Sequence, residues 1–369
     1  MEMIVDYIEP TSRSKITTSL SNKLRVYEID PLTDPRWPEL LSRHPQASIF
    51  HTCEWLKALQ KTYGYKPIAF TTSQNENLAD AIVFCEVRSW LTGQRLVSIP
   101  FSDHCQPLAE GDRLNAILRY LQVYCGKNRL RYVELRPMPL TPGFEQNTYF
   151  ANSESFSFQK IDLRPDAESL YGNFHDSCIR RKIKRAGREN LQYEHGRSEK
   201  LLRKFRHLLL LTRRRHKLPP QPASWFENLA KCLGEKITFH LLSKDEIPVA
   251  SIVTLMYKDS IIYKYGCSDS QFNNMGGTPL LFWKVIQQAK ADGAKEFDLG
   301  RSGYEDPGLI AFKEHLGAAS TELRYYRTPV PRSKNKSDKT ETSIVRTTLS
   351  RLPDQLLSGV GEIFYRHMG

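Results

Sequence analysis

The 369-residue sequence lacks the features that mark several special classes of protein. Its seven cysteines are dispersed and include no C-x-x-C pair, so neither a structural zinc site nor a disulfide framework is indicated. No apolar run approaches the roughly 20 residues that span a bilayer. The first residues, MEMIVDYIEP, carry acids and lack the pattern of a signal peptide. We therefore expect a cytoplasmic protein with reduced, mostly buried thiols.

The composition is that of an ordinary folded protein, and the length favours two domains over one. Thr52 is a plausible N-cap, and apolar spacing predicts a helix over 113–124. Thr141-Pro142-Gly143 opens a polar stretch typical of a domain boundary. We expect a strand over 158–163 to close the first domain. Helices at 167–174, 177–188 and 198–216 would follow, and then strands at 237–242, 249–257 and 322–326.

The most informative stretch covers residues 261–317. A β-type run ends at a loop with two glycines, and an amphipathic helix follows. A short strand then ends in the letters FDLGRS, and a second helix comes after it. This order predicts a βαβ unit with polar groups gathered at the strand ends, where open α/β sheets bind their ligands.

Four pieces of this stretch, YKYG at 263–266, PLLFW at 279–283, FDLGRS at 297–302 and GLIAFK at 308–313, occur in a characteristic order. In that order they resemble the C-terminal half of FemAB-like proteins of the GNAT acyltransferase superfamily, which includes the CelD/BioF-type acetyltransferase-like domain. The resemblance implies an α/β fold of two tandem GNAT-like mixed-sheet domains with helices on both faces. The expected parts are a disordered N-terminus (1–22), an N-terminal domain (23–165), a C-terminal GNAT-like domain (166–330), a linker (331–342) and an amphipathic helical tail (343–369).

The resemblance also implies acyl or aminoacyl transfer to an amine of a cell-envelope or polysaccharide-related precursor. Backbone groups on a splayed strand at about 260–267, beside a neighbour at 296–299, would hold the donor. The donor would be acyl-CoA or aminoacyl-tRNA, and no metal is required. The loop at 270–277 lacks the Q/R-x-x-G-x-G/A register with which many such enzymes bind the CoA pyrophosphate, so the donor stays open.

Three residues are candidates for catalysis: Lys313, Asp298 and Tyr265. Lys313 matches the lysine of the family's F-K motif and would stabilise the oxyanion or a donor phosphate; otherwise it is a solvated helix lysine. Asp298 and Arg301 flank the end of the short strand. They either form an internal ion pair, or the planar guanidinium of Arg301 binds a substrate carboxylate or phosphate. Tyr263 and Tyr265 alternate on one strand and should share a face. They would pack in the core, bind substrate or protonate a leaving group.

The letters PFSDHCQP at 100–107 are unusual for a loop. Adjacent Asp, His and Cys residues cannot form a nucleophilic triad, because such groups converge from different segments. No second ligand cluster with suitable spacing points to a metal. We expect Asp103 and His104 to line the cleft between the domains as substrate-binding residues, which agrees with a comparable loop in the family.

The net charge of +12 comes from one segment. Residues 180–217 contain 15 Lys or Arg and 3 Asp or Glu, whereas the rest of the chain has 38 of each sign. A focused basic field attracts anions, so we expect a phosphate-bearing small-molecule or lipid-linked substrate, or tRNA. Arg181, Lys182 and Arg215 are the candidate ligands. The alternatives are a solvated helix surface or a non-catalytic tRNA-binding protein on a degenerate GNAT-like scaffold.

Apolar residues recur every three or four positions from Val345 to Phe364, disturbed near Pro353. This pattern predicts an amphipathic helix. It would dock on the body of the protein or contact a protein partner or a membrane surface, and membrane contact would place the protein at the inner face of a membrane.

Overall fold

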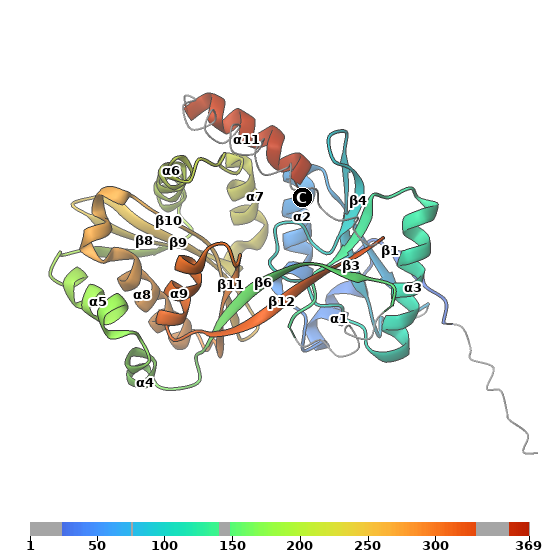
Figure 1. Cartoon of the computed structure of the whole chain (residues 1–369), viewed down its shortest axis with the longest axis horizontal. Coiled ribbons are helices and arrows are strands. Elements are labelled where there is room, and N and C mark those ends of the chain that lie inside the picture. The colour runs from blue at the N-terminus through green and yellow to red at the C-terminus, as the bar shows by residue number, and fades with distance from the viewer. Residues whose placement is uncertain (1–23, 75–76, 140–147, 330–353, 369) are drawn as a thin grey trace, which may run out of the picture.

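The computed structural model describes residues 24–74, 77–139, 148–329 and 354–368. In these residues one 12-stranded sheet runs through the whole molecule, in the order β1-β2-β3-β4-β5-β12-β6-β11-β10-β9-β8-β7 (Figure 1). The expected disordered N-terminus (1–22), the linker (331–342) and the start of the predicted tail lie outside the described residues.

The strands and helices follow the chain order of an α/β protein. The strands are β1 (Tyr27–Ile29), β2 (Lys66–Thr71), β3 (Ile82–Ser89), β4 (Gly93–Val97), β5 (Tyr132–Leu135), β6 (Ala151–Asp162), β7 (Gln192–Gly196), β8 (Ile237–Lys244), β9 (Ile247–Tyr257), β10 (Ser260–Ser268), β11 (Glu296–Ser302) and β12 (Ala319–Thr328). The helices are α1 (Trp37–Arg43), α2 (Cys53–Tyr63), α3 (Gly111–Lys127), α4 (Ala167–Gly172), α5 (Arg181–Ala186), α6 (Glu199–Arg215), α7 (Ala223–Leu233), α8 (Gly277–Ala291), α9 (Pro307–His315) and α11 (Asp354–Met368). Four short helical turns are η1 (Ile49–His51), η2 (Asp176–Arg180), η3 (Gly234–Lys236) and η4 (Ser270–Met275).

The same βαβ arrangement occurs in both halves of the sheet. Strands β4 and β5 pair in parallel and are joined through α3, and β10 and β11 pair in parallel and are joined through α8. The other ladders between the named strands are antiparallel. This repetition confirms the predicted fold of two tandem mixed-sheet units.

One strand lies in a different place from the one that the sequence suggests. The strand expected over 158–163 forms the end of β6, which pairs with β12 on one side and with β11 on the other. It therefore lies between β12 and β11 in the middle of the continuous sheet. Strand β12 also pairs through Tyr326–Thr328 with β5, which makes the sheet continuous across the seam between the halves. The domain boundary at 165/166 stays a prediction.

Helices cover both faces of the sheet (Figure 1). One face of the N-terminal half packs on α3, and one face of the C-terminal half packs on α4, α5 and α8. The opposite face carries α1 and α2 in the first half and α6 and α7 in the second, in one shared apolar cluster. Trp55 of α2 and Trp225 of α7 meet edge to face there, with ring centroids 5.4 Å apart. This helix pair buries apolar surface from both halves and fixes one half against the other.

The C-terminal helix α11 docks across the two halves at the top of Figure 1. The hydroxyl of Tyr65 donates to the carbonyl of Tyr365 at 3.0 Å, and the hydroxyl of Tyr365 donates to the carbonyl of Pro219 at 3.3 Å. A side chain at Gly361 would place its Cβ 2.1 Å from the carbonyl of Pro220. The glycine therefore allows the helix to lie directly on the backbone of the body.

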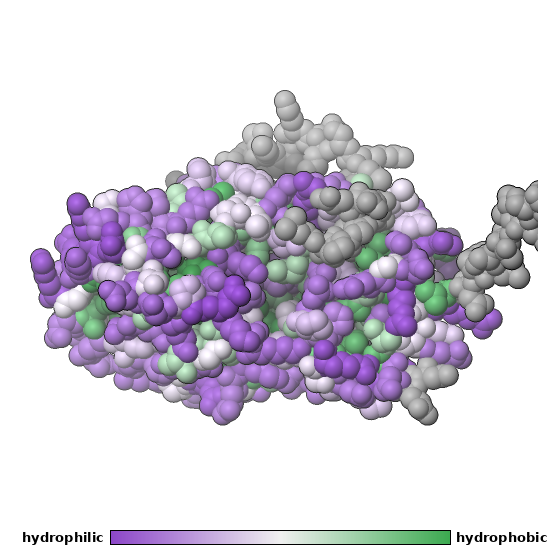
Figure 2. All heavy atoms as spheres, turned by 90° about the horizontal axis from the view of Figure 1, so that it is seen from below, coloured by the Kyte–Doolittle hydropathy of each residue, from purple (hydrophilic) through white to green (hydrophobic). Residues whose placement is uncertain are grey.

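None of the helices in the described ranges is long and apolar enough to cross a bilayer. Figure 2 shows the molecule from below, where hydrophilic side chains cover most of the face and hydrophobic ones form small separate areas.

Candidate acyl-transfer site

Strands β10 and β11 part near the middle of the sheet. Their parallel ladder covers only Ser260–Ile262 of β10 and Glu296–Asp298 of β11, although β10 continues to Ser268 and β11 to Ser302. Beyond this ladder, the facing edges of β10 and β11 are not paired with each other. The gap lies within the ranges that the resemblance assigns to the splayed strand and its neighbour.

A β-bulge in β10 changes where its side chains point. The pairing with β9 shifts register between Tyr263 and Tyr265, so Lys264 is the extra residue. Tyr263 packs beside Phe282, with ring centroids 5.1 Å apart, whereas Tyr265 accepts a 2.7 Å hydrogen bond from Trp225 on the opposite face. The expectation that the two tyrosines share a face is therefore wrong, because a bulge breaks the two-residue alternation.

Both tyrosines remain protonated near neutral pH. Burial raises the pKa of Tyr263 and the pKa of Tyr265. Tyr263 turns its hydroxyl back over Gly266, where an added Cβ would lie 2.0 Å from it. Packing is thus what the structure shows for these side chains.

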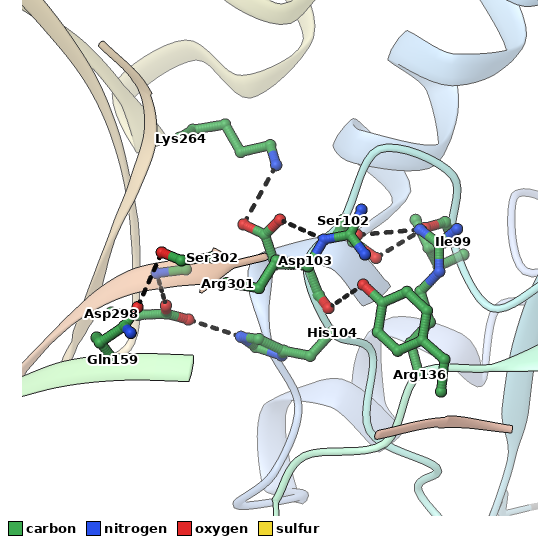
Figure 3. A network of polar contacts seen from close by, with 12 residues as sticks. Ile99, Ser102, Asp103, His104, Arg136, Gln159, Lys264, Asp298, Arg301 and Ser302 are labelled. Atoms are coloured by element: carbon green, nitrogen blue, oxygen red, sulfur yellow. Dashed lines mark hydrogen bonds and ion pairs between the residues drawn. The ribbon is translucent and has the colours of Figure 1, made fainter. Parts of the chain in front are cut away.

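Asp103 enters the gap from the N-terminal half. Its carboxylate lies 3.6 Å from Nζ of Lys264 on β10 and 3.7 Å from Nε of Arg301 on β11 (Figure 3). A side chain at Gly300 would meet this carboxylate, with its Cβ 2.7 Å from Oδ2. Gly300 also has φ +71°, so glycine is required there both for the backbone and for the approach of Asp103.

The loop that carries Asp103 is held in a strained shape. Ile99 and Phe101 have φ of 58° and 60°, which is rare for side chains of this size. The guanidinium of Arg136 donates to the carbonyls of Ile99 and Ser102, each at 3.0 Å, and the hydroxyl of Tyr325 donates to the carbonyl of Asp103 at 2.6 Å (Figure 3). Such strain persists where surrounding contacts over-determine the backbone, and it is concentrated at functional sites.

The charges in the gap keep Asp103 ionised. Burial acts to raise the pKa of Asp103, but the positive charges of Lys264 and Arg301 outweigh it and hold this pKa below the usual value of 3.8. Burial also lowers the pKa of Lys264, partly offset by Asp103. The guanidinium of Arg301 stacks on Phe156 and Tyr325, at 4.1 and 4.9 Å from the ring centroids. Aromatic rings therefore fix one of the two cations in place.

His104 and Asp298 form a second pair beside this group. Nε2 of His104 lies 2.6 Å from Oδ2 of Asp298, and the other oxygen of Asp298 accepts from the amide of Gly300 at 2.6 Å. Asp298 therefore pairs with His104 and not with Arg301, which pairs with Asp103. The buried Nδ1 of His104 has no hydrogen-bond partner. His104 and Asp298 also line a cavity of about 260 Å³ in the seam between the halves.

Lys313 is buried against the far side of β11. Its ammonium donates to Oε1 of Gln159 at 3.2 Å and to the carbonyls of Gly300 and Arg301 at 3.1 and 3.3 Å. These partners match the three donors of a lysine, so the side chain is neither solvated nor pointed freely into the gap. Burial lowers the pKa of Lys313 to about 8. The geometry makes Lys313 an anchor for the backbone that carries Arg301.

The three basic candidates are not gathered in one place. Lys182 lines a cavity of about 250 Å³ beside η4 and the start of α8, together with Ser268 and Phe312. The guanidinium of Arg215 donates to the carbonyl of Ser268 at 3.3 Å, but Arg215 does not line this cavity. Arg181 is instead exposed and pairs with Asp176 at 3.1 Å. Of these three candidates, the cavity lining includes Lys182 alone.

Several residues of the site escaped prediction from the sequence. Lys264 stands within the recognised YKYG letters, but only the bulge turns it toward Asp103. Gln159 and Tyr325 lie on β6 and β12, outside the stretch at 261–317, and nothing in their spacing marks them. The cleft position of Asp103 and His104 was expected, and the structure places both at the junction of the halves.

Residues 175–314 match the family described as Acetyltransferase (GNAT) domain. No curated protein matches the sequence. Among solved structures, FemX shares the fold over 88% of this chain and 97% of its own, with a TM-score of 0.62 and 13% identity. A tandem GNAT protein from the clavulanic acid biosynthesis pathway matches 84% of this chain and 99% of its own, with a TM-score of 0.53 and 10% identity. At such identities the solved structures show a common fold.

The fold of tandem units and the match to the GNAT family agree with the motifs in 261–317. Residues 175–314 form an acetyltransferase domain of the GNAT family, and the whole chain shares its fold with FemX and with a tandem GNAT protein.

Proposed function

We propose that the chain transfers an acyl or aminoacyl group to an amine of a phosphate-bearing precursor of the cell envelope or of a polysaccharide. The observation that carries this proposal is the Asp103 carboxylate, which lies between Lys264 and Arg301 where β10 and β11 part. The gap accommodates the donor carbonyl, and the amine approaches it from the side of Asp103.

The three charges match the charges that develop in the reaction. When a neutral amine attacks a carbonyl, its nitrogen becomes positive and the carbonyl oxygen becomes negative. Asp103 stabilises the nitrogen, and Lys264 or Arg301 stabilises the oxyanion. The lowered pKa of Asp103 makes it a weak proton acceptor at neutral pH, so its role is to align the amine and offset its charge. When the tetrahedral intermediate collapses, the bond to the CoA sulfur or the tRNA ribose oxygen breaks, and the leaving group takes up the proton that the nitrogen releases, so the products are the amide and the free thiol or hydroxyl.

The donor binds along the cavity beside η4. Helix α8 begins there without a side-chain cap, so its first amides are available to a phosphate. Lys182 supplies positive charge from the lining of this cavity, and the guanidinium of Arg215 binds the carbonyl of Ser268, another lining residue. Gly276, with φ +75°, lies so close to Lys182 that an added Cβ would be 2.3 Å from the Lys182 carbonyl. This contact brings α5 close to the donor phosphates.

A ligand screen tests the proposal. Melting temperatures measured with CoA thioesters, charged tRNA and nucleotide sugars identify the donor and acceptor, because a ligand that binds only the folded state raises the melting temperature. Candidate pairs are then assayed for amine-dependent consumption of the thioester or aminoacyl ester. If tRNA binds with a steep salt dependence and no pair is turned over, the chain is a nucleic-acid binder and the proposal fails.

Lys182→Gln should weaken binding of the phosphate-bearing donor about fivefold, since an exposed cation contributes up to about 1 kcal/mol. The loss should shrink at high salt, because screening already weakens this attraction. Isothermal titration with the donor at two salt concentrations measures it. Lys184→Gln is the matched control, because Lys184 is exposed on the same helix α5 but does not line the cavity. Equal losses in both variants would contradict this role of Lys182.

We also propose that the protein contacts an anionic lipid surface through α11 and the β3–β4 hairpin. Large exposed hydrophobic residues gather on these two elements: Trp90 (84%), Leu91 (62%), Ile363 (65%), Phe364 (40%) and Met368 (53%). The rings of Trp90 and His367 meet at 5.6 Å, which joins hairpin and helix in one surface. The exposed Arg366 adds positive charge to α11, and Arg88 on β3 is exposed but pairs with Glu86 at 3.1 Å. Tryptophan beside cations suits the interface of a bilayer.

The double variant Trp90→Ser, Phe364→Ser should lower partitioning onto phosphatidylglycerol vesicles by at least about tenfold, since each buried apolar side chain contributes about 1.5–3 kcal/mol. Co-sedimentation measures the bound fraction, with phosphatidylcholine vesicles as the uncharged comparison. Val123→Ser is the control, because Val123 is 65% exposed on α3. If wild-type protein does not sediment with anionic vesicles, the lipid contact is refuted, whereas acyl transfer is unaffected.

A further inference from the structure

A cluster of two histidines and a cysteine lies outside the acyl-transfer site. His175 precedes η2, Cys178 lies within η2, and His315 ends α9. The donor atoms of the three side chains all lie within 4.8 Å of one another. Cys178 and His315 are half-buried and His175 is exposed, so an ion can reach the cluster from solvent.

The chemistry and geometry of these donors suit a zinc-like cation. Imidazole nitrogen and thiolate sulfur are its preferred ligands, and three protein ligands leave a fourth position for water. Zinc binds nitrogen at about 2.0–2.1 Å and sulfur at about 2.3 Å, so the donor atoms would close in slightly through side-chain rotation. Nδ1 of His175 has only long contacts, at 3.3 Å to the amide of Cys178 and 3.4 Å to Oγ of Ser177, and a metal can replace them.

The backbone already holds the two elements together. The amide of His175 donates to the carbonyl of His315 at 2.9 Å, and the two imidazole rings lie 4.4 Å apart between centroids, at 47°. This contact fixes the spacing of the two histidines before any ion binds. Preorganised ligands of this kind raise metal affinity, because less side-chain freedom is lost on binding.

We propose that His175, Cys178 and His315 form a binding site for a divalent zinc-like cation that links η2 to the end of α9. Helix α5 follows η2 directly and carries Lys182, whereas α9 carries Phe312, and both residues line the cavity beside η4. The ion therefore stiffens two walls of that cavity. His175 and Cys178 are close in the sequence, but His315 comes from a distant part, so sequence spacing does not reveal the complete set of ligands.

Cobalt(II) is the spectroscopic probe for this site. Titration of the tag-free full chain should produce a thiolate-to-cobalt charge-transfer band that saturates at one equivalent and is removed by zinc. Cys178→Ser should abolish the band, and His315→Gln should weaken metal binding by at least about tenfold. Cys232→Ser and His207→Gln are the matched controls, because Cys232 is half-buried on α7 and His207 is exposed on α6. A band of unchanged intensity in Cys178→Ser would overturn the proposal.

Alkylation of the wild-type protein gives a second measurement that needs no variant. Zinc should slow iodoacetamide labelling of Cys178 by at least about tenfold, because a metal-bound thiolate is withdrawn from reaction. Peptide mass spectrometry should find labelling of Cys53 and Cys232 unchanged. Equal labelling of Cys178 with and without zinc would rule out the site.

Discussion

Asp103→Asn should lower kcat for acyl transfer about 100- to 1000-fold, the usual loss when one preorganised group that stabilises transition-state charge is removed. The amide has nearly the shape of the carboxylate but cannot offset the positive charge on the attacking nitrogen. It also leaves Lys264 and Arg301 without their shared anion. Donor affinity should change little, because the cavity beside η4 does not include Asp103. Steady-state kinetics with the donor and acceptor found by the ligand screen measure both quantities.

The matched control for this variant is Asp112→Asn, at an exposed position near the start of α3. It should keep wild-type turnover. Circular dichroism and thermal melting establish that Asp103→Asn is folded, so that a lost activity reports on chemistry. A folded Asp103→Asn enzyme with kcat within about threefold of wild type would refute the role of Asp103 in charge stabilisation.

Lys313→Met should lower kcat by about 100-fold through the backbone of β11. The ammonium holds the carbonyls of Gly300 and Arg301 and the side chain of Gln159, and methionine leaves all three acceptors without this donor. Because Arg301 then loses its fixed position beside Asp103, the effect should appear in kcat more than in the donor KM. Lys61→Met, on the exposed side of α2, is the control and should retain activity.

The pH dependence of stability distinguishes a buried Lys313 from a solvated one. The pKa of Lys313 falls from 10.5 to about 8 on folding, because burial disfavours the charged form. Between these two values the unfolded state binds more protons than the folded state, so this group adds folding stability as pH rises from about 8 to about 10.5. The difference in unfolding free energy between wild type and Lys313→Met should therefore grow by up to about 1.4 kcal/mol per pH unit in this window.

Urea unfolding of both proteins at pH 7.5, 8.5 and 9.5, chosen to cover about this window, measures that difference. Lys61→Met should show a constant difference from wild type, since an exposed lysine has nearly the same pKa in both states. A flat difference for Lys313→Met would mean that Lys313 is solvated. In that case the anchor to Gly300 and Arg301 does not exist in solution.

Local sequence signals were sufficient to predict several of the helices and strands. Thr52 caps α2, with Oγ1 3.3 Å from the amide of Trp55, as the letters around it predict. The helix expected over 113–124 is α3, and those over 167–174 and 198–216 are α4 and α6. The order of motifs in 261–317 also predicted the parting of β10 and β11. Helix caps, apolar spacing and motif order depend on residues that are close in the sequence, so they can be recognised without the tertiary structure.

The sequence by itself determined the fold class and the GNAT-type motifs of the C-terminal half, because these depend on patterns within short segments. Only the tertiary structure decided which charges meet. The bulge at Lys264 turns that side chain toward Asp103 and separates Tyr263 from Tyr265, and Asp298 finds His104 instead of Arg301. These outcomes depend on strand pairing and on contacts between the two halves of the sheet. Contacts between distant segments produce no periodic pattern in the sequence, so they could not be predicted from it.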